Sequence, residues 1–190
     1  MSLLQITLIV LGVIAAIVIL LVIVVALRPS QFRIERSAKI SAPAEAVFAQ
    51  VNDFHNWNAW SPWAKLDPAM KETYDGPAVG VGAKYAWEGN SKVGQGRSTI
   101  MESNPSSLIR TKLEFIKPFT AINVGEFTFQ PEGNQTGVTW AMTGTNDFMG
   151  KAFGLFMNMD KLIGSDFEKG LASLKSLTET THSSSGRGPG

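Results

Sequence analysis

The chain has 190 residues, with 17 Lys or Arg and 16 Asp or Glu, so its net charge is only +1. This balance does not favour nucleic acid or an acidic partner. The absence of cysteine excludes a disulfide framework, a thiol nucleophile and thiolate zinc sites. All charged side chains follow residue 27, which divides the chain into an uncharged start and a remainder of ordinary globular composition.

The uncharged start contains a run typical of a membrane helix. Residues 6–27 (ITLIVLGVIAAIVILLVIVVAL) hold one hydroxyl and no charge. As a helix they rise roughly 33 Å, which matches a hydrocarbon core of about 30 Å. A cleaved signal peptide is the weaker interpretation, because no Lys or Arg precedes the run and no A-x-A site follows it. We therefore predict an uncleaved single-pass transmembrane anchor over residues 1–28.

The flanks of this run predict its orientation. Four basic residues follow it, namely Arg28, Arg33, Arg36 and Lys39, whereas only the α-amine precedes it. Because excess Lys and Arg stay in the cytoplasm, we expect the soluble domain on the cytoplasmic side. Gly12 and Ala16 form a small-xxx-small pair that would let two anchors pack weakly, although small residues are common in such helices.

A strand and two short helices are expected next. Residues 31–40 alternate in polarity, which predicts a strand. Residues 41–45 (SAPAE) read as a helix start, with a cap candidate, a proline in the first turn and an early acid. A second short helix over 54–60 would place Phe54, Trp57 and Trp60 on one side, and Pro62 cannot continue it.

After these helices the residue pattern changes and predicts a series of strands. Alternating runs separated by Gly, Pro and Asn fall at about residues 70–75, 82–88, 93–103, 107–117, 119–130 and 136–145. Six consecutive strands with short turns predict an antiparallel meander with one buried face. Residues 150–178 switch to a helical period, and the polar residues 179–190 are expected to be a disordered tail.

Sequence motifs for cofactors and metals are missing. Gly94-x-Gly96 lacks the third glycine of a dinucleotide fingerprint, and Gly150-Lys151 lacks the rest of a phosphate-binding loop. The sequence contains no H-E-x-x-H and no G-x-S-x-G, and its only histidines are His55 and His182. We therefore expect neither a cofactor nor a metal.

The chain resembles the SRPBCC superfamily with the START-like helix-grip fold, and within it the polyketide cyclase/dehydrase-like branch. The matching stretches are residues 40–48 (ISAPAEAVF), 54–63 (Phe54-x-x-Trp57-x-x-Trp60-Ser61-Pro62-Trp63), 137–140 (GVTW) and 167–174 (FEKGLASL). The resemblance implies an α+β domain over residues 29–178. In it a curved antiparallel sheet of about seven strands wraps around a long C-terminal helix, with two short helices after the first strand and a cavity. It carries over no catalytic residue, since no catalytic signature is shared across the superfamily.

The concentration of tryptophan at residues 57–63 allows two interpretations. Trp57, Trp60 and Trp63 form either a structural clamp at the helix junction or an aromatic rim at a pocket mouth. Pro62 is expected to direct Trp63 away from the other two rings, which makes Trp63 the candidate for the rim. The other candidates for lining the cavity are Tyr85, Trp87, Phe115, Phe127, Trp140, Phe153, Phe156 and Asp160.

Two ionisable residues admit alternatives. His55 is suited by its pKa to acid–base chemistry, but a lone histidine beside Asp53 and Asn56 equally fits a solvated face. Asp160 falls near the apolar stripe of the last helix, where it either contacts a ligand or sits at the edge of the stripe, paired with Lys161 or water.

The sequence thus favours a membrane-tethered binding module for a hydrophobic small molecule, lipid-like or polyketide-like. The alternative is an enzyme of the cyclase, dehydratase or hydrolase kind that uses the same cavity. A third possibility is a tethered interaction protein without a ligand. The first is preferred because inward-facing ionisable residues are scarce and no nucleophile–base pair is evident.

Overall fold

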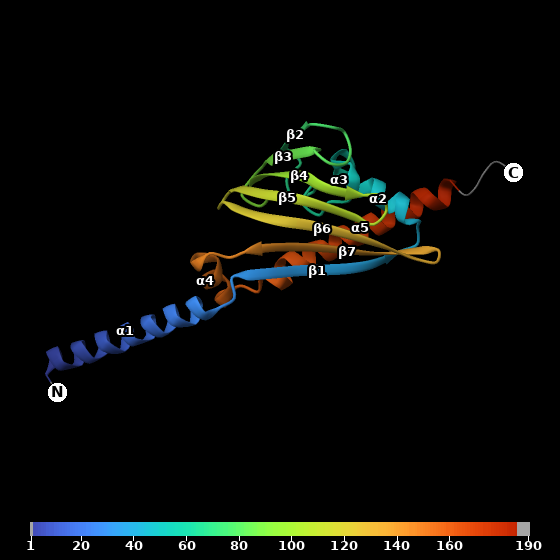
Figure 1. Cartoon of the computed structure of the whole chain (residues 1–190). Coiled ribbons are helices and arrows are strands. Elements are labelled where there is room, and N and C mark those ends of the chain that lie inside the picture. The colour runs from blue at the N-terminus through green and yellow to red at the C-terminus, as the bar shows by residue number, and fades with distance from the viewer. Residues whose placement is uncertain (1, 186–190) are drawn as a thin grey trace. The chain divides into compact units, whose positions relative to one another are not determined.

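The computed structural model describes residues 2–185 (Figure 1). The chain forms two compact units. The anchor unit comprises the chain up to Phe32 together with Thr145–Met159. The sheet unit comprises Arg33–Gly144 and the chain from Asp160 onward.

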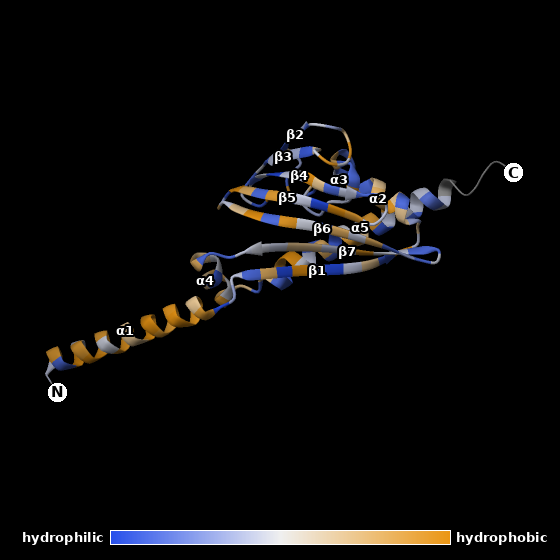
Figure 2. Cartoon of the chain, in the orientation of Figure 1, coloured by the Kyte–Doolittle hydropathy of each residue, from blue (hydrophilic) through white to orange (hydrophobic). Residues whose placement is uncertain are grey.

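Helix α1 of the anchor unit spans Leu3–Leu27. Ser2 caps it and exchanges hydrogen bonds with Gln5, and Val25 is its single buried residue. In Figure 2 the ribbon of α1 has the orange colour of hydrophobic residues along most of its length. Its length and composition fit either a membrane span or a signal sequence, and no other helix among residues 2–185 passes that test.

The sheet has seven strands in the order β1-β7-β6-β5-β4-β3-β2. Their bounds are β1 Gln31–Ile40, β2 Lys71–Asp75, β3 Lys84–Glu88, β4 Gln95–Asn104, β5 Leu108–Lys117, β6 Ala121–Glu132 and β7 Gln135–Thr145. Consecutive strands from β2 to β7 pair antiparallel, which confirms the predicted meander. The first strand returns to lie beside the last.

The helices differ from the prediction in two places, at the break near residue 157 and beyond residue 178. The helices after the first strand are α2 (Ala44–Asn52), the 3-10 turn η1 (Phe54–Asn56) and α3 (Trp57–Trp60). The predicted helix over 150–178 is two helices, α4 (Phe148–Phe156) and α5 (Met159–Ser185), because the backbone becomes extended at Met157. The predicted disordered tail from 179 is helical as far as Ser185, and residues 186–190 lie outside the described residues.

The core of the sheet unit lies between α5 and one face of the sheet, along which α5 runs (Figure 1). Phe167 of α5 stacks on Trp140 of β7 with ring centroids 4.2 Å apart. Leu171 and Leu174 of the same helix are fully buried, and Phe48 of α2 packs edge-on against Phe129 of β6. This face of the sheet, hereafter the inner face, carries most of the aromatic side chains.

The opposite face is charged and solvated. Glu114 accepts hydrogen bonds from Arg97 across β4 and β5, and Glu126 accepts hydrogen bonds from Arg110 and Arg33. The hydrogen bonds from Arg97, followed by the contact with Lys112, lower the pKa of Glu114 to about 2. The alternation of polar and apolar residues along the strands therefore yields one wet face and one dry face, as antiparallel sheets commonly do.

The burial of Trp60 generates a stability prediction. Its side chain is 1% exposed, so Trp60→Ala should lower the free energy of unfolding by about 3–5 kcal/mol. Phe119 is 67% exposed, so Phe119→Ala should change it by less than about 0.5 kcal/mol. Chemical unfolding of the full chain in detergent, followed by circular dichroism, measures both. Wild-type stability in Trp60→Ala would contradict the assigned packing.

Candidate ligand-binding site

The site is built on the C-terminal end of α2. The last four carbonyl groups of a helix have no partner within it. In α2 each of these four carbonyl groups accepts a hydrogen bond from a residue outside the helix. Two donors are indoles: Trp60 Nε1 donates to Gln50 O at 3.3 Å, and Trp57 Nε1 donates to Val51 O at 3.0 Å. The other two are Asn56 Nδ2, which donates to Ala49 O at 3.4 Å, and Gly80 N, which donates to Asn52 O at 3.2 Å. Two of the three clustered tryptophans therefore fix α3 to the end of α2.

From this anchor point an aromatic chain crosses the inner face to α5. Trp57 and Trp60 both meet Phe127 edge-on, with centroids 6.0 Å away. Trp60 and Trp63 each lie 5.6 Å from Trp140, and Trp140 in turn stacks on Phe167. Trp60, Phe127 and Trp140 are buried, whereas Trp57 and Trp63 are half-buried.

A second aromatic row lies toward the β2 edge of the sheet. Tyr74 on β2, Tyr85 and Trp87 on β3 and Phe115 on β5 follow one another with centroid distances of 5.5, 5.7 and 6.1 Å. All four side chains are half-buried. Phe54 links this row to the tryptophans, because its ring lies 5.1 Å from Trp57 and 5.8 Å from Tyr85. This edge of the inner face thus presents partly accessible aromatic surface.

A carboxylate accompanies the second row. Glu72 of β2 accepts hydrogen bonds from Tyr85 Oη at 2.7 Å, Asn58 Nδ2 at 2.7 Å and Tyr74 Oη at 3.4 Å. Burial, followed by the bond to Glu72, raises the pKa of Tyr85 far above its usual value. Burial and the nearby Glu72 charge also raise the pKa of Tyr74. Both phenols are therefore held protonated as hydrogen-bond donors.

One buried hydroxyl on this face is unpaired. Ser98 of β4 is 2% exposed, and its Oγ finds no hydrogen-bond partner among residues 2–185. Ser98 is in register with Tyr85 on β3 and Leu113 on β5. Residues paired in register share a face of the sheet, so this hydroxyl lies on the aromatic side. A buried polar group without a partner is uncommon and calls for an explanation.

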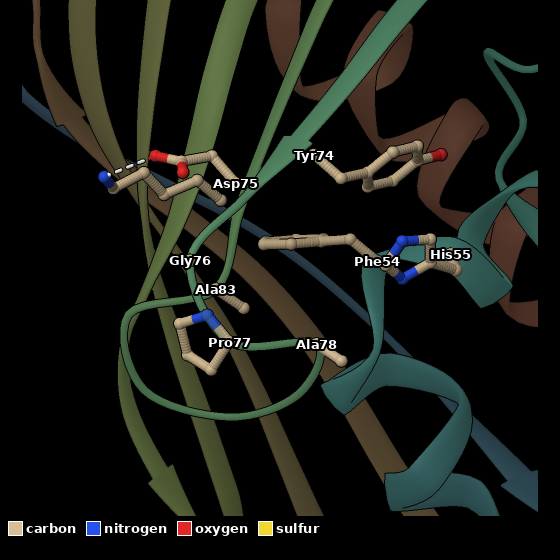
Figure 3. A pocket seen from close by; sticks show the side chains of 9 residues that line it. Phe54, His55, Tyr74, Asp75, Gly76, Pro77, Ala78 and Ala83 are labelled. Carbon is tan, nitrogen blue, oxygen red and sulfur yellow. Dashed lines mark hydrogen bonds and ion pairs between the residues drawn. The ribbon is translucent and has the colours of Figure 1, made fainter.

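A small pocket opens where η1 meets the β2–β3 connection (Figure 3). Its volume is about 220 Å3, and its lining includes Phe54, His55, Tyr74, Pro77 and Ala83. Figure 3 shows the Phe54 ring between the Tyr74 side chain and the loop that carries Pro77 and Ala78. The His55 ring stacks on Tyr74 at 4.1 Å, and its Nδ1 lies 2.7 Å from Asp53 Oδ1. Pockets for drug-sized ligands occupy roughly 300–1,000 Å3, so this one suits a smaller group.

The predicted site residues separate into two sets. The structure brings together eight of them on or beside the inner face, namely Trp57, Trp60, Trp63, Tyr85, Trp87, Phe115, Phe127 and Trp140. Phe153 and Phe156 instead lie on α4 with 58% and 79% of their surfaces exposed. The sequence analysis did not single out Glu72, Tyr74 or Ser98. The alternation of residues along β2 and β4 was a local signal that these side chains share a face with their apolar neighbours.

The position of Asp160 does not support the hypothesis that it contacts a ligand. Its side chain is 62% exposed and forms two hydrogen bonds with the guanidinium of Arg36, at 3.0 and 3.1 Å. These bonds lower the pKa of Asp160. Arg36 also bonds Glu168 at 2.7 Å, so Asp160 belongs to an exposed ion-pair network between β1 and α5. The structure agrees better with the other interpretation, in which Asp160 lies at the edge of the apolar stripe, but its partner is Arg36.

The fold and this inner face define a class of protein. A seven-stranded antiparallel sheet with a long C-terminal helix against its aromatic face is the helix-grip arrangement of the SRPBCC superfamily, a fold that binds hydrophobic ligands. The chain belongs to the family described as polyketide cyclase / dehydrase and lipid transport, whose sequence profile matches residues 31–179. No curated protein matches the chain.

Solved structures share the fold at low sequence identity. Protein CV1439 from Chromobacterium violaceum is 17% identical, with a TM-score of 0.55 over 80% of this chain and 99% of that one. The di-domain ARO/CYC protein StfQ of the steffimycin biosynthetic pathway is 10% identical, with a TM-score of 0.60 over 81% of this chain and 52% of that one. Ara h 8.0201 is 8% identical, with a TM-score of 0.56 over 79% and 99%.

The two tyrosines of the chain permit a direct pH test of the site. Because the folded state raises the pKa of Tyr74 and Tyr85, their contribution to stability is complete below about pH 10 and is lost as the pH rises further. Tyrosinate absorbance should therefore remain low in the folded chain near pH 10 and increase together with alkaline unfolding.

Denatured chain provides the reference, because there both phenols titrate near pH 10. Tyr85→Phe should halve the absorbance change that accompanies alkaline unfolding. Two tyrosines that ionise near pH 10 in a chain with native circular dichroism would contradict the site as described.

Proposed function

We propose that the protein is a membrane-anchored binding module, whose sheet unit holds a hydrophobic small molecule against the inner face near β2–β5. The observation that carries this proposal is the buried, unpaired hydroxyl of Ser98 beside half-buried aromatic rings. A bound molecule with one polar atom would satisfy that hydroxyl, and its apolar body would cover the rings of Tyr85, Trp87 and Phe115.

The chemistry of the site favours a lipid-like or polyketide-like ligand. Aromatic surface gains from contact with flat rings or hydrocarbon chains. The ordered donors nearby are phenols that are already bonded to Glu72, which leaves the Ser98 hydroxyl as the group with unused capacity. The family description, which includes lipid transport, supports the same ligand class.

Binding is a better-supported role than catalysis. The pKa values of Tyr74 and Tyr85 are raised, away from the neutral range in which a general acid works best. Among residues 2–185 no group of three His, Asp or Glu side chains is placed to hold a metal. A cyclase or dehydratase activity at the same face is the alternative function, which turnover assays alongside the binding studies would reveal.

The proposal includes a tether. Helix α1 would span the membrane, and the basic residues that follow it would keep the sheet unit on the cytoplasmic side. A tethered binding domain meets an apolar ligand where that ligand is most concentrated, at the membrane.

Ser98→Ala tests the ligand site. In the ligand-free state this change removes a buried unpaired hydroxyl and should raise the free energy of unfolding by about 1–3 kcal/mol. It should also weaken ligand binding by about tenfold, the equivalent of one lost hydrogen bond. Residues 30–185, produced without α1 and checked for cooperative unfolding, allow native mass spectrometry of co-purified molecules without membrane lipid.

Ser37→Ala is the control, because Ser37 is also a strand serine but is exposed, and its Oγ bonds Thr139 Oγ1 at 2.7 Å. It should change stability by less than about 0.5 kcal/mol and leave binding unchanged. The ligand proposal fails if no small molecule co-purifies or if both serine variants retain the same amount.

A second experiment tests the tether. Mass spectrometry of the chain extracted from membranes should show residues 1–28 still present. A C-terminal reporter that folds only outside the cytoplasm should stay inactive, whereas one that folds only inside it should be active. A mature chain that lacks the apolar run would identify a signal peptide, and an active outside reporter would reverse the proposed orientation.

A further inference from the structure

Helix α4 exposes an unusual amount of apolar surface for its length. None of its nine residues is buried. Met149, Phe153 and Phe156 are 61%, 58% and 79% exposed, and Phe148 is 48% exposed. Contiguous exposed patches of this kind mark surfaces that contact a membrane or another molecule.

The apolar side chains of α4 share one side of the helix. Met149, Phe153 and Phe156 stand at positions i, i+4 and i+7, which places them on one face. Lys151 and Gly154 fall on the opposite face by the same periodicity. Helix α4 is therefore amphipathic, with its aromatic side unpartnered among the described residues and its other side available to the rest of the anchor unit.

That other side is bonded to the end of α1. Arg28 Nη1 donates to Gly154 O at 2.8 Å, and Lys151 Nζ donates to Ala26 O at 3.4 Å. Just before α4, Asn146 N donates to Ser30 O at 2.8 Å. Figure 1 shows α4 beside the C-terminal end of α1. Three bonds thus fix α4 at the level of residues 26–30.

This level is where the apolar run of α1 stops. Leu27 is the last residue of α1, and Arg28 is the first charged side chain of the sequence. If α1 spans a bilayer, residues 26–30 lie at the boundary between acyl chains and headgroups. Amphipathic helices at that boundary turn Phe, Leu or Trp toward the acyl chains, and basic side chains there face lipid phosphates.

From this placement we propose that α4 is an interfacial membrane helix, which inserts Met149, Phe153 and Phe156 between the lipid headgroups and the upper acyl chains. The proposal rests on the proposed function in that α1 must span the bilayer. It adds a second attachment that fixes the anchor unit against the lipid surface, with Arg28 and Lys151 beside the phosphates.

A bilayer fits this surface better than a protein partner. Helix α1, to whose end α4 is bonded, is itself apolar and exposed along almost its whole length. Interfacial helices of this kind bury their apolar face about 5–10 Å below the headgroups while the polar face stays wet. A second copy of the chain, paired through the same face, is the rival occupant.

The natural absence of cysteine permits a site-specific test. Single changes Phe156→Cys, Ile17→Cys and Val81→Cys introduce one thiol each for a fluorophore whose emission reports polarity. Val81 is 59% exposed and lies in the β2–β3 connection, so it is a matched apolar surface position. Each labelled full chain is placed in vesicles of phosphatidylcholine and phosphatidylglycerol that carry spin-labelled lipids, with the quencher near the headgroup or deep in the acyl chain.

The label at 156 should emit at shorter wavelength than the label at 81, and the shallow quencher should reduce its fluorescence more than the deep one. The label at 17 should respond mainly to the deep quencher. A quenched label at 17 with an unquenched label at 156 overturns the α4 proposal alone. An unquenched label at 17 overturns the anchor itself, and energy transfer between labels at 156 without lipid quenching identifies a second copy as the occupant, which also overturns the proposal.

Discussion

The saturation of the four carbonyl groups at the end of α2 is the constraint on which the inner face and the proposed ligand site depend. Two of the four donors are indole N–H groups of Trp57 and Trp60, so the rings cannot move without leaving a helix end unpaired. Unpaired buried groups are costly, which holds both rings in one orientation. Their faces then determine where Phe127 and Trp140 pack, and through Trp140 where α5 lies against the sheet.

One end of the inner face is filled and the other is partly open. Near β6 and β7 the rings of Trp60, Phe127 and Trp140 fill the space under α5 and are buried. Toward β2 and β3 the aromatic row continues but remains half-buried. The polar groups Glu72 and Ser98 lie in this second region. A preformed apolar surface with a few polar groups is the usual composition of a small-molecule site, whereas the filled region contributes stability.

Local patterns were sufficient to predict most of the fold. The strand at 31–40 and the strand predicted at 107–117, observed at 108–117, alternate strongly and end at turn residues. The register between strands has no such local signal, so the convergence of Glu72, Tyr74 and Tyr85 could not be read from the sequence. The helix beyond 178 was missed because its polarity suggested disorder. There Thr180 and Ser183 bond carbonyl groups four residues earlier, which satisfies their hydroxyls within the helix.

The break between α4 and α5 was missed for a different physical reason. A helical period of apolar residues shows that a face avoids water, but it does not show what that face contacts. Phe153 and Phe156 continue the spacing of Phe167 and Leu171, yet Phe167 and Leu171 are buried whereas Phe153 and Phe156 are exposed. The sheet unit buries a large apolar core, whereas α1 and α4 leave nearly all of their apolar side chains exposed, although both units use the same residue types. The hydrophobic effect favours the inward arrangement in water, whereas lipid, which is as apolar as these side chains, does not oppose the outward one. The two arrangements meet at the extended residue Met157, and the proposed attachment of α1 and α4 to a membrane accounts for the outward one.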